Sequence, residues 1–398
     1  MNRLILVAGV LAAMGAEAAG FSVDTQGGRA TGMATAVSAH IDDASAAFYN
    51  PAGTVRGPEK YDLMLGDTLI FPNSQVTTAT GIRTDSQVDV VPPPHAYFAY
   101  GVNDQVSIGL GFTSHFGNTT EWPEDWVGRQ RSIRSELQVF DLNPVAAYNF
   151  HDRVRLGAGF QLVRSTVELV RGLNFVDSQG TVELGGGAWG YGANAGVQVD
   201  VVPRVLLIGV SYRSAVNLEF DGGRAHFENV PLELSDRLAD QPVSAEVTLP
   251  EVVMGGVAVR PIPSLLLAFD VNYFAWSRFQ ELTIHFQDPA LSSTLPKRWD
   301  DVVNFHLGGE LAVTPKLKLR AGAVYDPTPS PSDTLTPDLP DFDRVKLTAG
   351  AGYRVGNIYG DLGYQFVWLT ENQSTAPTFP ATYSGTAHLV GLTLSIRI

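Results

Sequence analysis

Apolar residues alternate with small or polar residues along many segments of this chain. Residues 105–112, 153–162, 206–220, 317–325 and 391–398 all show this period of two. In the last of these segments, Leu392, Leu394 and Ile396 would lie on one face, and Thr393 and Ser395 on the other. A period of two places successive side chains on opposite faces of a β-strand. The sequence therefore predicts an all-β fold.

Alternation fits a soluble β-sandwich as well as a membrane barrel, and the polar face decides between them. Arg155, Asp270, Arg320 and Arg354 occupy predicted strand positions. They would be costly in a sandwich core, whereas a barrel lumen is hydrated. Aromatic residues near predicted strand ends fit the interfacial girdles of a barrel: Tyr97, Phe98, Tyr100, Tyr148, Phe150, Tyr212, Phe220, Tyr273, Phe274, Trp276, Tyr325, Tyr353, Tyr364, Phe366 and Trp368. The sequence predicts an antiparallel transmembrane β-barrel.

The N-terminus has the features of a secretory signal peptide. Arg3 provides a positive charge, Leu4 to Met14 form an apolar run, and Ala16-Glu17-Ala18 has the small-x-small form of a cleavage site. We predict a signal peptide at residues 1–18 and a mature start at Ala19. No later segment approaches the roughly 20 apolar residues of a transmembrane helix. Charged residues make up only 17% of the chain, compared with about 25% in soluble domains.

Length and turn chemistry suggest how the barrel is organised. Residues 56–398 form the predicted barrel, and a share of roughly 24 to 27 residues per strand gives about fourteen strands, with twelve to sixteen as the range. Short polar connections read as periplasmic turns. Long ones read as extracellular loops: Thr113 to Glu136, Asp221 to Thr248, His285 to Val302, Asp326 to Arg344 and Thr370 to Gly385.

Residues 19–55 do not follow the strand pattern. They are rich in Ala, Gly, Ser and Thr, and Met33, Val37, Ile41 and Ala44 have a helical spacing. The segment ends in Asn50-Pro51-Ala52-Gly53, whose Pro and Gly are expected to stop regular structure. A fourteen-stranded barrel would leak unless its lumen were filled. We therefore predict a small, partly helical hatch in the lumen, with a periplasmic tail as the alternative.

Charge and residue types exclude several functions. The formal net charge is -14, which disfavours nucleic acid as a partner. With no Cys and eight scattered His, no metal site or cofactor is predicted, and the His are expected at the surface and in turns. Asp338, Asp341 and Asp343 are expected in a solvated acidic loop, with a divalent-cation site as the alternative. No nucleophile-elbow sequence indicates an enzyme.

Several motifs, taken in order, resemble the FadL/TodX family of outer-membrane transporters for long-chain fatty acids and hydrophobic compounds. The resemblance spans almost the whole mature chain. It rests on the segments Ala19-Gly20-Phe21, Asp43 to Gly53 with Asn50-Pro51-Ala52, Trp122 to Arg129, Asn143 to Tyr148, Trp189 to Gly192, Ser211 to Ser214, Trp276 to Phe279 and Tyr325 to Pro329. The resemblance implies a monomeric fourteen-stranded barrel in a Gram-negative outer membrane, in contact with its lipid and lipopolysaccharide. It also implies an outer groove, an inner pocket and a sideways exit.

The resemblance also assigns roles to particular residues. Phe21 matches the family's N-terminal pocket aromatic, and Arg171 falls where a fatty-acid-binding member has a carboxylate-pairing Arg. The family often has Trp-Lys-Asp where this chain has Trp299-Asp300-Asp301, so neighbouring Lys297 or Arg298 would have to supply the second cation. The expected function is passive uptake of hydrophobic molecules, with long-chain fatty acids first and neutral aromatic hydrocarbons second. An adhesin or structural barrel, a general porin and a lipid-cleaving enzyme are the alternatives from other classes.

Overall fold

The fold was determined from a computed structural model, which describes residues 20–54, 60–150 and 153–398. The predicted signal peptide at 1–18 and the predicted hatch boundary at residue 55 lie outside these ranges. In the described ranges, no helix has the length and apolar character needed to cross a membrane.

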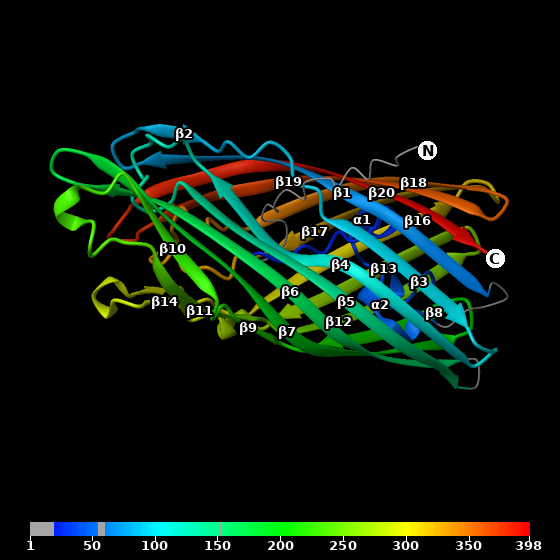
Figure 1. The fold of residues 1–398 in the computed structure, drawn as a ribbon. Coiled ribbons are helices and arrows are strands. Elements are labelled where there is room, and N and C mark those ends of the chain that lie inside the picture. Colours follow the sequence, from blue (N-terminus) through cyan, green and yellow to red (C-terminus); the bar gives the residue numbers. More distant parts are fainter. Residues whose placement is uncertain (1–19, 55–59, 151–152) are drawn as a thin grey trace, which may run out of the picture.

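Fourteen strands close into one antiparallel barrel (Figure 1). In the order in which neighbours pair, they are β1 (Tyr61–Thr78), β3 (Pro94–Gly101), β4 (Val106–Glu121), β5 (Arg134–Phe150), β6 (Val154–Asn174), β7 (Gln179–Val202), β8 (Leu206–Arg213), β12 (Val252–Ile262), β13 (Leu265–Phe274), β16 (Val302–Ala312), β17 (Leu317–Asp326), β18 (Arg344–Val355), β19 (Ile358–Ser374) and β20 (Ala381–Arg397). Pairing of β1 with β20 closes the barrel. The predicted fold and strand number are confirmed.

The two faces of the wall follow the alternation in the sequence. In β20, Leu392 and Leu394 are 48% and 57% exposed, whereas Thr393 and Ser395 are buried. The outer face is therefore apolar and suits lipid. Asp270 and Arg320 are buried inside the barrel, as predicted for lumen positions. Four of the aromatic residues assigned to the girdles are instead buried inside: Tyr97, Phe220, Phe274 and Trp276. Phe274 shares its face of β13 with Asp270, so strand parity places it inward.

The long connections lie at the end of the barrel opposite the C-terminus (Figure 1). They carry further elements: β2 (Arg83–Asp85), β9 (Val216–Glu219), β10 (Gly223–Glu228), β11 (Gln241–Leu249), β14 (Glu281–Phe286), β15 (Ser293–Pro296), η2 (Leu232–Leu234), η3 (Trp276–Arg278) and η4 (Pro289–Leu291). Two of the predicted loops therefore begin in strand, because β4 reaches Glu121 and β19 reaches Ser374. Strand pairing therefore continues into the long connections, and these extended strands line a cavity there.

Residues 20–54, which we call the hatch, lie inside the barrel (Figure 1). They form α1 (Gly28–Gly32), α2 (Ala46–Tyr49) and the 3-10 helix η1 (Pro51–Thr54). The single helix suggested by the spacing of Met33 to Ala44 is wrong, because Ala34 and Thr35 adopt positive φ values of 53° and 54° and end α1. Pro51 begins a helical turn rather than ending one, since proline suits the first turn.

Glycines of the barrel wall make room for the hatch. A Cβ at Gly209 of β8 would lie 2.3 Å from the carbonyl oxygen of Ser38, and one at Gly308 of β16 would lie 2.3 Å from that of Met33. A Cβ at Gly157 of β6 would lie 2.3 Å from the carbonyl carbon of Pro51. The hatch backbone thus contacts the wall too closely for any side chain at these three positions. This contact explains part of the high glycine content.

A candidate hydrophobic ligand pathway

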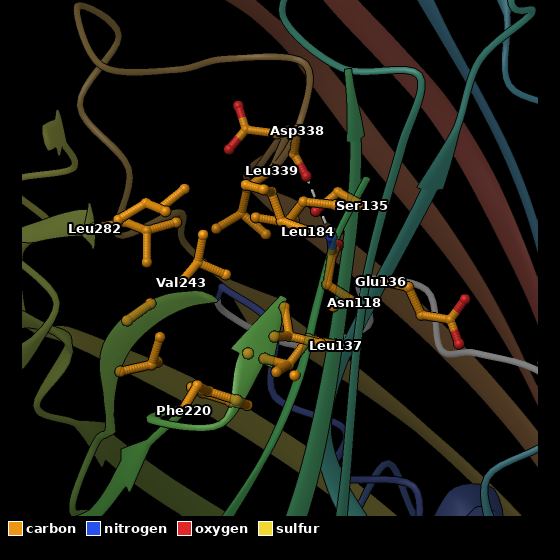
Figure 2. Close-up of a pocket in the computed structure, with 18 of the residues that line it drawn as sticks. Asn118, Ser135, Glu136, Leu137, Leu184, Phe220, Val243, Leu282, Asp338 and Leu339 are labelled. Carbon is orange, nitrogen blue, oxygen red and sulfur yellow. Dashed lines mark hydrogen bonds between the residues drawn. The ribbon is translucent and has the colours of Figure 1, made fainter. Parts of the chain in front are cut away.

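An apolar cavity opens in the extracellular half of the molecule, between the extended strands and the loops (Figure 2). Its lining atoms surround about 830 Å³ of empty space, which includes space open to solvent. The apolar lining consists of Phe21, Leu137, Val167, Leu169, Leu184, Phe220, Val243, Val247, Phe279, Leu282, Ile284 and Leu339. Figure 2 shows Leu339 and Asp338 on one side of the cavity and Phe220 on the other. We call this space the upper cavity.

Phe21 lies at the inner end of the upper cavity, among other aromatic rings. Its ring centroid is 4.7 Å from that of Trp276, and 5.8 Å from those of Phe279 and Trp299. Gly20 has φ +67°, and a Cβ there would lie 2.4 Å from Trp299. The chain therefore needs glycine before Phe21 in order to enter the aromatic cluster. The structure places Phe21 at the cavity, and its role in ligand binding stays a prediction.

Replacing Phe21 with alanine is expected to lower the stability of the folded barrel. Phe21 is 2% exposed, and removing a buried phenylalanine typically costs about 3–5 kcal/mol. The midpoint of thermal unfolding in detergent, followed by circular dichroism, measures the effect. Phe71→Ala is the matched control, because Phe71 is exposed on the outer face of the barrel. Equal midpoints for the two variants would show that Phe21 contributes no packing.

Lys297 and Asp338 form the buried ion pair of the upper cavity. The Nζ atom of Lys297 lies 2.9 Å from Oδ2 of Asp338 and donates to the hydroxyl of Thr336 at 3.2 Å. Both side chains line the cavity. Burial opposes ionisation of Asp338, but Lys297 and Arg171 outweigh burial and lower the pKa of Asp338 to about 2. The pair is therefore charged at neutral pH.

The expectation of a solvated acidic loop at residues 338–343 is wrong for two of its three carboxylates. Asp338 pairs with Lys297, and Asp341 pairs with buried Arg344. Both carboxylates are buried because the loop folds over the cavity rather than into solvent. In the described part of the chain, no three His, Asp or Glu side chains are grouped in a way that could hold a metal ion. The histidines also differ from expectation, since His40, His95, His115 and His306 are buried.

Arg171 lies near this ion pair, on the same face of β6 as two residues of the cavity lining. Val167 and Leu169 line the cavity, and Arg171 is the next inward position towards the strand end. It is close enough to act electrostatically on Asp338, yet it is not itself part of the cavity lining. Among described residues, Arg171 makes no ion pair. Arg298 instead lies at the surface with Asp333, whereas Lys297 lines the cavity, so Lys297 stays the predicted second cation.

The hatch begins with an isolated β-bridge between Ser22 and Phe116 of β4. The amide of Val23 donates to the carbonyl of His115, and the amide of Gly117 donates to the carbonyl of Phe21, both at 2.8 Å. The register of β4 against β5 shifts between Thr113 and Phe116. The residues that follow Phe21 are thus hydrogen-bonded to an irregular point in the wall.

On the side of β4 that faces β3, this part of the strand has no paired strand of the barrel among the described residues. Pairing of β3 with β4 ends at Ala96 and Phe112. The chain before β3 reads Pro92-Pro93-Pro94, and proline has no backbone N–H to donate to a sheet. The wall between β3 and β4 is therefore interrupted at the level of the irregularity in β4.

A lower cavity lies between the hatch and the wall, beneath the aromatic cluster. About 440 Å³ of empty space, space open to solvent included, lies between its lining atoms, which include Ser22, Phe48, Phe116, Phe274 and His115. The ring centroids of Phe21 and Phe116 are 6.1 Å apart. Because Phe21 lines the upper cavity and Phe116 the lower one, these rings separate the two spaces.

The Asn50-Pro51-Ala52 motif joins the hatch to β6, β7 and β8. The Nδ2 atom of Asn50 donates to the carbonyls of Ser38 at 2.8 Å and Val197 at 3.1 Å, and its Oδ1 accepts from the amide of Ala52 at 3.2 Å. The motif thus ties the end of the hatch to its middle and to the wall. The structure places this motif away from the upper cavity, which suits a role in anchoring.

The sequence does not identify two residues at the site: Trp276, which packs against Phe21, and Asp338, which lines the upper cavity. Trp276 was assigned to the interfacial girdle, and Asp338 to a solvated loop. Trp276 lies beyond the end of β13, so the alternation of that strand does not predict which way its side chain points. The isolated Lys297 between two loops gave only a weak signal for a partner acid, because no sequence pattern links positions 297 and 338.

Comparisons with known proteins point to one family. The profile of the family described as "Outer membrane protein transport protein (OMPP1/FadL/TodX)" matches residues 9–398. The long-chain fatty acid transport protein of Escherichia coli O6:H1 is 26% identical, over 88% of this chain and 86% of its own length. Outer membrane protein P1 of Haemophilus influenzae is 26% identical, over 99% and 98%. A crystal structure of a Pseudomonas aeruginosa FadL homologue superposes with a TM-score of 0.83 at 18% identity, covering 95% of this chain and 99% of the other. That of the P. putida toluene transporter TodX gives 0.75 at 17%, covering 98% and 99%.

Proposed function

Because the chain belongs to the OMPP1/FadL/TodX family of outer membrane transport proteins, we propose that this channel takes up long-chain fatty acids. Family members are channels for hydrophobic compounds in the outer membrane rather than enzymes. The finer proposal concerns the ligand and its route. It rests on one observation: an apolar cavity has two cations at one side, Lys297 in its lining and Arg171 nearby.

The charged groups at one side of the cavity leave one positive charge that a ligand carboxylate could neutralise. Lys297 and Arg171 carry two positive charges, and Asp338 carries one negative charge, which leaves one net positive charge. Glu136 also lines the cavity and pairs with Arg134, which also pairs with Glu168. A lysine ammonium has three donors, and Lys297 uses two of them on Thr336 and Asp338. The third donor and Arg171 can bind the head group of a fatty acid, while its alkyl chain lies along the apolar lining.

The two cavities and the interrupted wall form a route for the ligand. We infer that a fatty acid passes from the upper cavity, past Phe21 and Phe116, into the lower cavity. From there it would leave between β3 and β4, where strand pairing is interrupted. Each stage exchanges one apolar environment for another, so transfer needs no energy source beyond the gradient. Movement of the segment that begins with Phe21 would open the passage, as a shift between two populated arrangements.

Ligand binding to the purified, detergent-solubilised barrel tests this proposal. Quenching of tryptophan fluorescence can follow binding, because Trp276 and Trp299 pack against Phe21 at the inner end of the cavity. We expect a long-chain fatty acid to bind, and Arg171→Ala to weaken that binding about tenfold while leaving toluene binding unchanged. A charged hydrogen bond or ion pair of this kind contributes about 1.5 kcal/mol.

The second candidate is uptake of neutral aromatic hydrocarbons. Asp338 already neutralises Lys297, and the inner end of the cavity is formed by aromatic rings, which favours this alternative. Binding of toluene without binding of the fatty acid would establish it. Binding of neither ligand would argue against transport and in favour of an adhesive or structural barrel.

A further inference from the structure

The loop that carries Asp338 is held at the edge of the upper cavity by three hydrogen bonds, two from the end of β4 and one from Trp122, which follows it. Asn118 and Thr120 donate to the carbonyl of Asp338 at 3.3 and 3.2 Å, and the indole of Trp122 donates to the carbonyl of Pro337 at 3.0 Å. Figure 2 shows the bond from Asn118 as a dashed line. These bonds fix the backbone at Asp338 and so help to place its side chain beside Lys297.

The carboxylate of Asp338 occupies one of the positions at which a carboxylate can accept a hydrogen bond from Lys297. It accepts from Lys297 at 2.9 Å, and both groups line the same cavity. A ligand head group binding to Lys297 would come within a few ångströms of Asp338, and two carboxylates that share one cation repel each other. Uncharged ligands meet no such repulsion, because the Lys297–Asp338 pair is neutral as a whole.

We propose that Asp338 is a built-in competitor for the cationic site, and that it determines how strongly the channel prefers uncharged ligands over carboxylates. The proposal rests on the proposed function, because it assumes that ligands enter the upper cavity. Asp338 lowers the net charge of the group formed with Lys297 and Arg171 from two positive charges to one. Carboxylates therefore bind, but less tightly than they would without Asp338. A transport channel needs this balance, since a ligand that is held too tightly is not released.

The test compares a fourteen-carbon fatty acid with the fourteen-carbon alcohol, on wild type and Asp338→Asn. Asparagine keeps the shape and hydrogen-bonding capacity of the side chain but removes its charge. We expect Asp338→Asn to bind the acid about tenfold or more tightly than wild type, with alcohol binding unchanged. Asp333→Asn is the matched control, because Asp333 lies in the same loop and pairs with Arg298 at 2.6 Å, but both residues are exposed. This control is expected to leave both affinities unchanged.

A second variant covers the case in which Asp338→Asn does not fold. Lys297→Met/Asp338→Leu removes both charges together and so leaves no unpaired charge in the cavity. We expect it to bind the alcohol as wild type does and to bind the acid more weakly, because the cation at position 297 is lost. Heat-dependent mobility on a denaturing gel reports whether each barrel is folded.

The outcomes separate the two proposals. If wild type binds neither acid nor alcohol, the proposed function fails. If wild type binds both, but Asp338→Asn leaves the acid-to-alcohol ratio unchanged or lowers it, the role of Asp338 is disproved while the channel proposal stands. An unchanged ratio in the double variant would also disprove it.

Discussion

Replacing Gly209 with alanine is expected to open the barrel lumen to small ions while leaving the barrel itself folded. A Cβ at this position of β8 would lie 2.3 Å from the carbonyl oxygen of Ser38 and 2.7 Å from the Cα of Ala39, both of which are backbone atoms. Such overlap costs about 1–3 kcal/mol or more, so the hatch must move. The carbonyl of Ser38 accepts from Asn50 at 2.8 Å and from Gln198 at 3.1 Å, and both bonds would be strained.

Ion conductance of the barrel in planar bilayers measures this effect. We expect wild type to conduct poorly and Gly209→Ala to conduct several-fold more. Gly255→Ala is the control, because Gly255 lies on neighbouring β12 and the nearest atom to its Cβ would be the carbonyl oxygen of Val271 at 4.0 Å. If Gly209→Ala and Gly255→Ala both conduct like wild type, the hatch is not the barrier to ions.

Replacing Lys297 with methionine is expected to reduce fatty-acid affinity about 10- to 100-fold. Hydrogen bonds to charged groups contribute about 1.5–3 kcal/mol, and each 1.4 kcal/mol is about tenfold in affinity. Methionine preserves the length and apolar stem of the side chain, so toluene binding should change little. Fluorescence quenching with both ligands measures the difference.

Arg298→Gln serves as the control for Lys297→Met. Arg298 is the next residue in the chain, but it is exposed and pairs with Asp333 outside the cavity. Its substitution should affect neither ligand. Full fatty-acid affinity in Lys297→Met, with toluene binding intact, would place the head group elsewhere. Loss of both ligands would instead indicate that unpaired Asp338 had disrupted the cavity, since breaking a buried pair costs about 3–5 kcal/mol.

The barrel and its strand number could be predicted because their signals are local. Apolar residues such as Leu392 and Leu394 alternate with Thr393 within one strand, and a membrane requires a closed sheet, so alternation over the whole chain implies a barrel. The hatch could be located for a related reason, because residues 20–54 lack that alternation. Its internal conformation could not be predicted, since contacts with wall glycines such as Gly209 and Gly308 override helical spacing.

What the sequence by itself determined was therefore the architecture, and what only the tertiary structure decided was the composition of the candidate site. Arg171, Lys297 and Asp338 come from β6, the segment after β15 and the loop after β17, and no periodicity relates them. Barrel closure brings these three segments together over one cavity, and burial there turns an acidic loop residue into the partner of Lys297. Local patterns follow from the backbone geometry of each strand, whereas charge pairing depends on distances that exist only after the chain has closed.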